Sequence, residues 1–229
     1  MVWKLTFAVI LEVAYAIGTR VYLGHYYGGI ELELYKTAIR GFTAIIYWML
    51  FHDLIRSQSP RFATARRPLF GFAIVLIMLS PIITGDEGLP DAIAKTVFAL
   101  TSIVVGLREE ILYRGVLQNL LEKRMGWIPA LIVSNVIFTL YHYGAQPFTP
   151  LGLTMLFSMG SILGLIYYGT RSLALVVAFH SIYDALWALV PFVSKPLPRL
   201  WGTCLEITAL ALLTFWAWRQ CTPGKDTRR

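Results

Sequence analysis

The chain has 229 residues, of which 57% are hydrophobic and only 14% are charged, a composition that excludes an ordinary soluble domain and is typical of a helical membrane protein. The formal net charge of +7 would suit a nucleic-acid-binding protein, but the positions of Lys and Arg between apolar segments are explained by membrane topology, so no nucleic-acid partner is expected. Cys204 and Cys221 are about 25 Å apart along one helix, so they neither bridge each other nor form a zinc motif.

Eight apolar spans follow one another along the chain, each close to the ~20 residues that a helix needs to cross a bilayer. Short polar or Pro/Gly segments separate them, without a composition shift or a repeat. The sequence therefore predicts an all-α, polytopic membrane helical bundle with about eight transmembrane helices. It is expected to form a single domain over 1–229, with a motif-bearing core at about 91–190. The predicted spans are Val2–Leu23, Ala38–Ile55, Pro68–Thr84, Asp91–Leu121, Trp127–Tyr143, Pro150–Thr170, Ser172–Val190 and Leu200–Gln220.

The placement of Lys and Arg predicts the orientation of the bundle, because cytoplasmic segments carry an excess of these residues. Eight spans put both ends of the chain on the same side. That side collects twelve of the twenty Lys and Arg residues and the opposite side six, which predicts an N-in, C-in orientation. The twelve residues are Lys4, Arg56, Arg61, Arg66, Arg67, Lys123, Arg124, Arg171, Arg219, Lys225, Arg228 and Arg229.

The first span has one feature of a signal peptide, since Ala14-Tyr15-Ala16 resembles a cleavage site. However, Glu12 interrupts its apolar region and only Lys4 precedes it. The first span is therefore expected to be a retained helix.

A charged cluster lies inside the fourth, otherwise apolar span, where Arg108, Glu109, Glu110 and Arg114 occupy four of seven positions. A charged side chain costs roughly 2.5–3.5 kcal/mol at the centre of a bilayer, so such a cluster needs partners and usually has a function. Glu110 and Arg114 are one helical turn apart, in the order that favours an ion pair. No Arg lies one turn from Glu109 on the same face of the helix, which makes Glu109 the candidate for proton transfer. A structural ion pair with a spare glutamate is the alternative interpretation.

Two histidines lie within apolar spans, in Phe138-x-x-x-His142 and in His180-x-x-x-Asp184. The members of each pair are one turn apart and share a helix face. A single buried histidine is usually a satisfied core residue. However, Glu109, His142 and His180 lie about 18, 23 and 12 Å from the predicted cytoplasmic ends of their spans, at about 1.5 Å per residue. Three helices thus carry polar groups to one layer near mid-membrane, which predicts a single site.

These residue types can hydrolyse an amide. A glutamate and a histidine facing the same water act as a general base. A second histidine and an aspartate stabilise the oxyanion, or the aspartate orients the histidine. Glu109, His142 and His180 could also bind zinc, but the HExxH spacing is absent, so zinc is permitted and no cofactor is required.

Three motifs on three helices resemble the signature of the CAAX-protease and bacteriocin-processing family, also called the Abi family: Glu109-Glu110-x-x-x-Arg114, Phe138-x-x-x-His142 and His180-x-x-x-Asp184. Its best-known branch is the type II CAAX prenyl endopeptidase. The resemblance spans about 95–190 and implies an intramembrane endopeptidase in which Glu109 and His142 activate water. It assigns oxyanion support to His180 and Asp184, and supporting positions to Glu110, Arg114 and Phe138. The prenyl-protease branch has Asn where this chain has Asp184, which fits a bacterial-type member better.

The resemblance to compact bacterial members also implies an integral protein of the bacterial inner membrane. Its expected substrate is a membrane-anchored protein or peptide, such as a leader, a bacteriocin or a C-terminal sorting tail. Two other functions remain open: a non-proteolytic immunity or scaffold protein of the same fold, and a proton-coupled transporter. The complete set of Glu109, His142 and His180 weighs against the first, and the lack of an inverted repeat weighs against the second.

Overall fold

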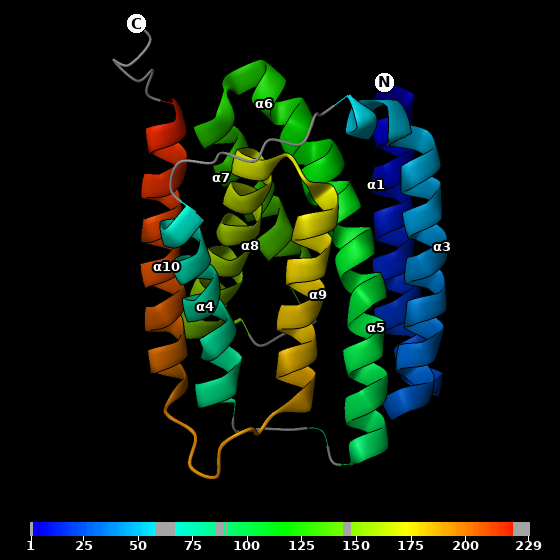
Figure 1. Ribbon diagram of the computed structural model, residues 1–229. Coiled ribbons are helices and arrows are strands. Elements are labelled where there is room, and N and C mark those ends of the chain that lie inside the picture. The colour runs from blue at the N-terminus through cyan, green and yellow to red at the C-terminus, as the bar shows by residue number, and fades with distance from the viewer. Residues whose placement is uncertain (1, 58–66, 86–88, 90, 144–147, 222–229) are drawn as a thin grey trace, which may run out of the picture.

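The computed structural model describes residues 2–57, 67–85, 89, 91–143 and 148–221, and this part of the chain forms a bundle of helices without a β-strand (Figure 1). Two of the helical segments are π-helices, labelled η1 and η2. The elements are α1 (Val2–Ile17), η1 (Gly18–Leu23), α2 (Gly24–Tyr26), α3 (Gly29–Arg56), α4 (Arg67–Thr84), α5 (Ala92–Glu110), η2 (Ile111–Gln118), α6 (Asn119–Met125), α7 (Trp127–Tyr141), α8 (Pro150–Thr170), α9 (Leu173–Leu189) and α10 (Arg199–Cys221).

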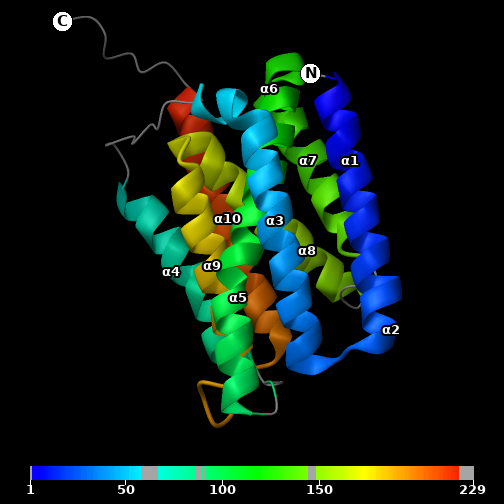
Figure 2. The ribbon, with the colours of Figure 1, turned by 90° about the vertical axis from the view of Figure 1, so that its right-hand side faces the viewer.

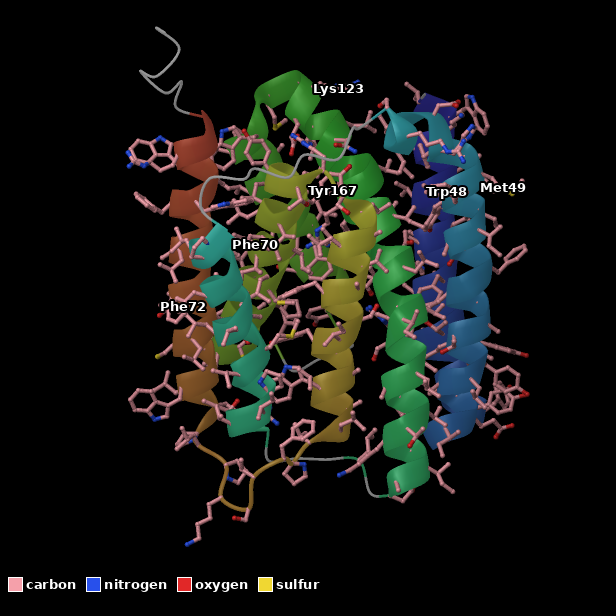
Figure 3. The ribbon with its side chains drawn as sticks, in the orientation of Figure 1. Trp48, Met49, Phe70, Phe72, Lys123 and Tyr167 are labelled. Carbon is pink, nitrogen blue, oxygen red and sulfur yellow. The ribbon has the colours of Figure 1, made fainter. Side chains whose placement is uncertain are left out.

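The eight predicted spans correspond to eight helical rods, which confirms the predicted all-α membrane bundle. Among the described residues, four helices are long and apolar enough to cross a bilayer: 2–26, 29–56, 150–170 and 199–219. Shorter apolar helices cover 68–84, 127–141 and 173–189. Figure 3 shows exposed Met49 and Phe72 pointing away from the bundle, while buried Tyr167 points into it. The chain is therefore an integral membrane protein whose apolar outer surface faces lipid.

Several helices begin at the residues that the sequence supplies for this purpose. The Asp91 side chain accepts a hydrogen bond from the first turn of α5, and Thr149 and Ser172 do the same for α8 and α9. Pro150 occupies the first turn of α8, where a missing N–H costs nothing. Gly126 separates α6 from α7 with a φ of 80°, which a residue without a side chain adopts readily.

The helical rods differ from the predicted spans most at the start of the second span. The first and fourth rods also continue past their predicted ends, to Tyr26 and Met125. The second span begins at Gly29 rather than Ala38, because the polar stretch before Ala38 is helical and the Arg40 guanidinium pairs with Glu33. Hydropathy treats these charges as breaks, whereas their pairing lets them lie inside the bundle. The helix of the fifth span ends at Tyr141 instead of Tyr143.

The first turn of α1 and the last turn of α10 lie at the same end of the bundle, at the top of both views (Figures 1 and 2). An even number of spans requires this arrangement. The N-in, C-in orientation itself stays a prediction. Five of the residues counted for it lie outside the described part of the chain: Arg61, Arg66, Lys225, Arg228 and Arg229.

Close approach of α8 to α7 depends on two glycines one turn apart. A Cβ atom on Gly160 would collide with Asn135 Oδ1, and one on Gly164 would collide with Leu131 Cδ1. Small residues at such a crossing let two backbones pack tightly in a membrane. The buried carbonyl oxygen of Gly160 also accepts a hydrogen bond from Arg114 Nη2 at 2.8 Å, so this crossing contacts the charged cluster directly.

Candidate active site

The charged cluster lies where α5 changes into a π-helix. Arg108, Glu109 and Glu110 are the last residues of α5, all are buried, and η2 begins at Ile111. π-helical segments are rare and occur frequently at functional sites. The α-helical geometry expected for the whole fourth span does not hold over Ile111–Gln118. Residue propensities carry no signal for a π-helix, so the change of helix type had to come from the structure.

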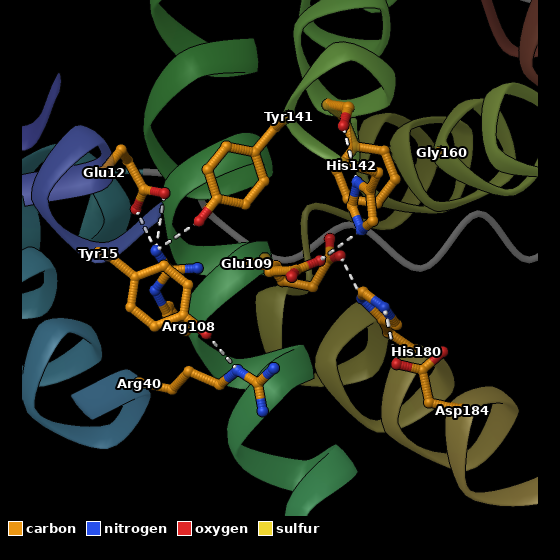
Figure 4. Close-up of polar contacts among 12 residues, drawn as sticks. Glu12, Tyr15, Arg40, Arg108, Glu109, Tyr141, His142, Gly160, His180 and Asp184 are labelled. Carbon is orange, nitrogen blue, oxygen red and sulfur yellow. Dashed lines mark hydrogen bonds and ion pairs between the residues drawn. The ribbon is translucent and has the colours of Figure 1, made fainter. Parts of the chain in front are cut away.

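Glu109 and His142 face each other across the α5–α7 contact (Figure 4). His142 is the residue that ends α7, and its Nδ1 lies 2.8 Å from the Phe138 carbonyl oxygen. That contact assigns the proton of the neutral ring to Nδ1, which leaves a lone pair on Nε2. The Nε2 atom lies 3.9 Å from Glu109 Oε2. Glu109 Oε2 is buried, and no described group donates a hydrogen bond to it.

The pair therefore consists of two hydrogen-bond acceptors that are too far apart for a direct hydrogen bond. An unpaired buried carboxylate oxygen is costly, so a donor between the two atoms would stabilise the site. A water molecule is the smallest group with two donors, and it can point one O–H at Glu109 Oε2 and the other at His142 Nε2. The geometry thus suits the binding and deprotonation of one water molecule.

His180 lies between two carboxylates. Its Nδ1 is 2.7 Å from Glu110 Oε1 and its Nε2 is 3.4 Å from Asp184 Oδ2. The same Glu110 oxygen accepts a hydrogen bond from Arg114 Nη1 at 3.1 Å, which confirms the ion pair expected from their spacing. The sequence analysis gave Glu110 a supporting position but did not connect it to His180. That contact crosses from α5 to α9 and depends on helix rotation, which spacing within one span does not determine.

A cavity of about 910 Å³ brings the four predicted catalytic residues together. Glu109, His142, His180 and Asp184 all line it, which agrees with the predicted common depth. The cavity continues to the end of the bundle where α3, α8 and α10 begin, since Leu32, Thr149, Leu151 and Arg199 also belong to its wall. The cavity thus connects the four residues with that end of the bundle.

A second buried polar cluster holds α1 and α3 against α5. Arg108 Nη2 donates to both carboxylate oxygens of Glu12, at 2.6 and 2.7 Å, and Arg108 Nε donates to Thr43 Oγ1 at 3.1 Å. The guanidinium also lies 4.0 Å from the centre of the Tyr15 ring. Sequence analysis used Glu12 only to argue against a signal peptide. Glu12 is an ionisable residue in an apolar span, and this feature alone could have indicated a buried partner.

The residues named for a zinc site do not fit one in this structure. Among the described residues, no three His, Cys, Asp or Glu side chains are grouped so that they could hold a metal ion. Both ring nitrogens of His180 already face carboxylates of Glu110 and Asp184. Glu109, His142 and His180 thus do not converge as three ligands on one point.

The comparison with protein families matches the part of the chain that carries these residues. Residues 92–186 match the model of the family described as type II CAAX prenyl endopeptidase Rce1-like. This segment, here called the Rce1-like segment, is similar to that family. The match confirms the resemblance expected from the three motifs. The Rce1-like segment contains all four predicted catalytic residues, whereas α1 and α3, which contact Arg108, lie outside it. No curated protein and no solved structure matches the chain.

Proposed function

We propose that this protein is an intramembrane endopeptidase that hydrolyses a peptide bond of a membrane-anchored protein or peptide. The Rce1-like match supports a CAAX-type intramembrane protease in general. The observation that carries the proposal is the pair of facing acceptors on the cavity wall, Glu109 Oε2 and His142 Nε2, at 3.9 Å. Such a pair binds water in the orientation that general-base hydrolysis needs.

The proposed reaction balances with water as the only co-substrate. The Glu109 carboxylate takes a proton from the water while the water oxygen bonds to the carbonyl carbon of the scissile peptide. His142 keeps the water oriented through its second O–H. The electron pair of the carbonyl double bond moves onto the carbonyl oxygen. When the tetrahedral intermediate collapses, the C–N bond breaks and Glu109 gives its proton to the leaving nitrogen, which regenerates the carboxylate.

His180 is the proposed donor to the oxyanion of that intermediate. With a carboxylate at each nitrogen, the imidazolium form of the ring donates from both. The contact of Nε2 with Asp184 is 3.4 Å long and the Asp184 side chain is 34% exposed, whereas the Nδ1 contact with buried Glu110 is 2.7 Å. We propose that Glu110 holds the ring while the Nε2–H turns from Asp184 to the oxyanion. Arg114 keeps Glu110 in place.

The substrate enters, in this proposal, from the end of the bundle that the cavity reaches. Leader peptides, bacteriocins and C-terminal sorting tails all present an extended segment next to a membrane anchor, and each fits this route. The proposed location is the bacterial inner membrane, in line with the resemblance to compact bacterial members.

We propose that catalysis needs no metal ion, because Glu109 and His142 together activate the water and the zinc ligand set does not converge. Dialysis of the purified protein against a strong chelator is expected to leave the cleavage rate within about twofold of the untreated protein, since a catalytic zinc ion would take its activated water with it. Loss of cleavage that returns on addition of Zn²⁺ would show that the proposed role of Glu109 is wrong.

The experiment that tests the proposed function compares peptide termini in membranes from cells that produce either the native protein or Glu109→Ala. We expect a discrete set of new termini with the native protein and none of that set with the variant. Glu31→Ala, at the exposed start of α3, is the control glutamate and is expected to behave as the native protein. Identical termini in all three membranes, with the variants normally inserted, would contradict proteolysis and favour a binding or immunity role.

A further inference from the structure

The position of His142 depends on how α7 ends. The last four carbonyl groups of a helix have no partner within the helix, and inside a protein they need donors from elsewhere. At the end of α7 each of them has one. The donors are His142 Nδ1 for Phe138, the His142 amide for Thr139, the Tyr143 amide for Leu140, and Arg20 Nη2 for Tyr141. Only the last donor comes from another helix, so this contact ties the end of α7 to the rest of the bundle.

Arg20 binds on both sides of His142 in the chain. Its Nη2 donates to the Tyr141 carbonyl oxygen at 2.7 Å and its Nη1 donates to the Tyr143 carbonyl oxygen. A guanidinium is a planar fork that can hold two acceptors in a fixed relation, which the single ammonium of a lysine cannot do. Its positive charge also complements the negative end of the helix dipole. Among the described residues Arg20 forms no ion pair with a carboxylate, so these carbonyl groups are its polar partners.

The segment that presents Arg20 is itself anchored to the residue before Glu109. Arg20 lies on the π-helix η1, which continues α1. About two helical turns before Arg20, Glu12 binds Arg108 through both carboxylate oxygens. Arg108 also donates to the Tyr141 hydroxyl at 3.2 Å, and the Arg20 guanidinium lies 5.5 Å from the centre of the Tyr141 ring. The rod formed by α1 and η1 thus contacts the chain next to both Glu109 and His142. Figure 4 shows the first of these contacts, between Glu12 and Arg108.

We infer that Arg20 is a positioning residue of the active site, and that α1 and η1 are part of the catalytic apparatus although they lie outside the Rce1-like segment. By holding the carbonyl groups of Tyr141 and Tyr143, Arg20 fixes the end of α7 so that His142 Nε2 faces Glu109. The effect on rate rests on the proposed function, whereas the effect on α7 does not depend on any activity.

The first arm of the test measures hydrogen exchange of the purified protein in detergent. Arg20→Ala is expected to speed exchange of the His142 and Tyr143 amides in the last turn of α7, with no change in α10. Arg20→Lys, which keeps the charge but not the fork, is expected to give an intermediate rate. Arg56→Ala, at the exposed end of α3, is the matched control and is expected to match the native protein.

The second arm measures cleavage of a synthetic peptide that spans the cleavage site found by mapping termini. Arg20→Ala is expected to lower kcat by roughly tenfold to a hundredfold, as misplacement of a catalytic group by about 1 Å does. A positioning role is expected to leave KM within about threefold. Arg20 also belongs to the cavity wall, so a rise in KM with kcat unchanged would show that it binds substrate instead. Arg20→Lys is expected to recover part of the lost rate.

The inference requires both effects in Arg20→Ala. Unchanged exchange in α7, or faster exchange with kcat unchanged, would overturn the positioning role. A variant that does not fold is replaced in both arms by Arg20→Lys, for which the same outcomes apply. Failure of the proposed function would look different, since the native protein itself would not cleave the peptide or Glu109→Ala would cleave it equally well.

Discussion

Replacing Glu109 with Gln is expected to lower kcat for peptide cleavage by about 10²–10⁴-fold, the range that a general base contributes. The amide has the shape of the carboxylate but cannot take the proton of the water that we propose binds between positions 109 and 142. KM is expected to change little, because the substituted group acts on water rather than on the peptide. The measurement uses the purified protein in proteoliposomes and the peptide defined by the mapped cleavage site.

Variants of His142 test whether Glu109 and His142 act on the same water molecule. His142→Ala alone is expected to lower kcat by about 10²-fold, since the water loses one of its two partners. The double variant Glu109→Gln/His142→Ala is expected to be no slower than Glu109→Gln, because residues that act as a unit on one water are not additive. Effects that multiply in the double variant would show that the two residues act in separate steps. Glu31→Gln is the control and is expected to keep the native rate.

The second large effect is expected on stability. Glu12→Gln removes the carboxylate that Arg108 binds, and the Arg108 side chain is only 1% exposed. Breaking a buried pair from one side leaves an uncompensated charge and typically costs about 3–5 kcal/mol. We expect the free energy of unfolding, measured by titration with a denaturing detergent, to fall by about this amount. The neighbouring Tyr47 hydroxyl, which donates to Glu12, does not carry a charge that could compensate.

A double replacement separates the charge effect from lost packing. In Glu12→Gln/Arg108→Met no unpaired charge remains, so most of the stability is expected to return. Asp53→Asn, at an exposed pair with His52, is the control and is expected to change the free energy of unfolding by less than about 0.5 kcal/mol. A double variant as unstable as Glu12→Gln would mean that Glu12 and Arg108 contribute through shape rather than charge.

The parts of the site that lie within one span could be predicted from the sequence. The Glu110–Arg114 pair follows from its spacing and is found at 3.1 Å. The common depth of Glu109 and His142 could also be predicted from their places within their own spans, because lipid thickness gives parallel helices a common scale. Apolar runs defined the helices themselves, since their length is set by the same thickness.

The contacts between helices could not be predicted, because they depend on rotation about each helix axis. The pairing of His180 with Glu110 is one case, and the binding of Arg108 to Glu12 is another. Arg108 and Glu12 are both ionisable residues in apolar spans, which usually indicates a function. This reasoning was used for Arg108 but not for Glu12. The amino-acid composition after Glu110 gives no indication of the π-helix.

The depth of the cavity bears on where the proposed endopeptidase would cut. Both His180, at the site, and Ala188, near the end of α9, line the cavity. Eight residues of helix separate them by about 12 Å. An extended peptide advances roughly 3.3–3.6 Å per residue, so about three or four residues cover this distance. For the endopeptidase proposed above, we expect the scissile bond to lie at least this many residues inside any chain end or turn that enters along α9.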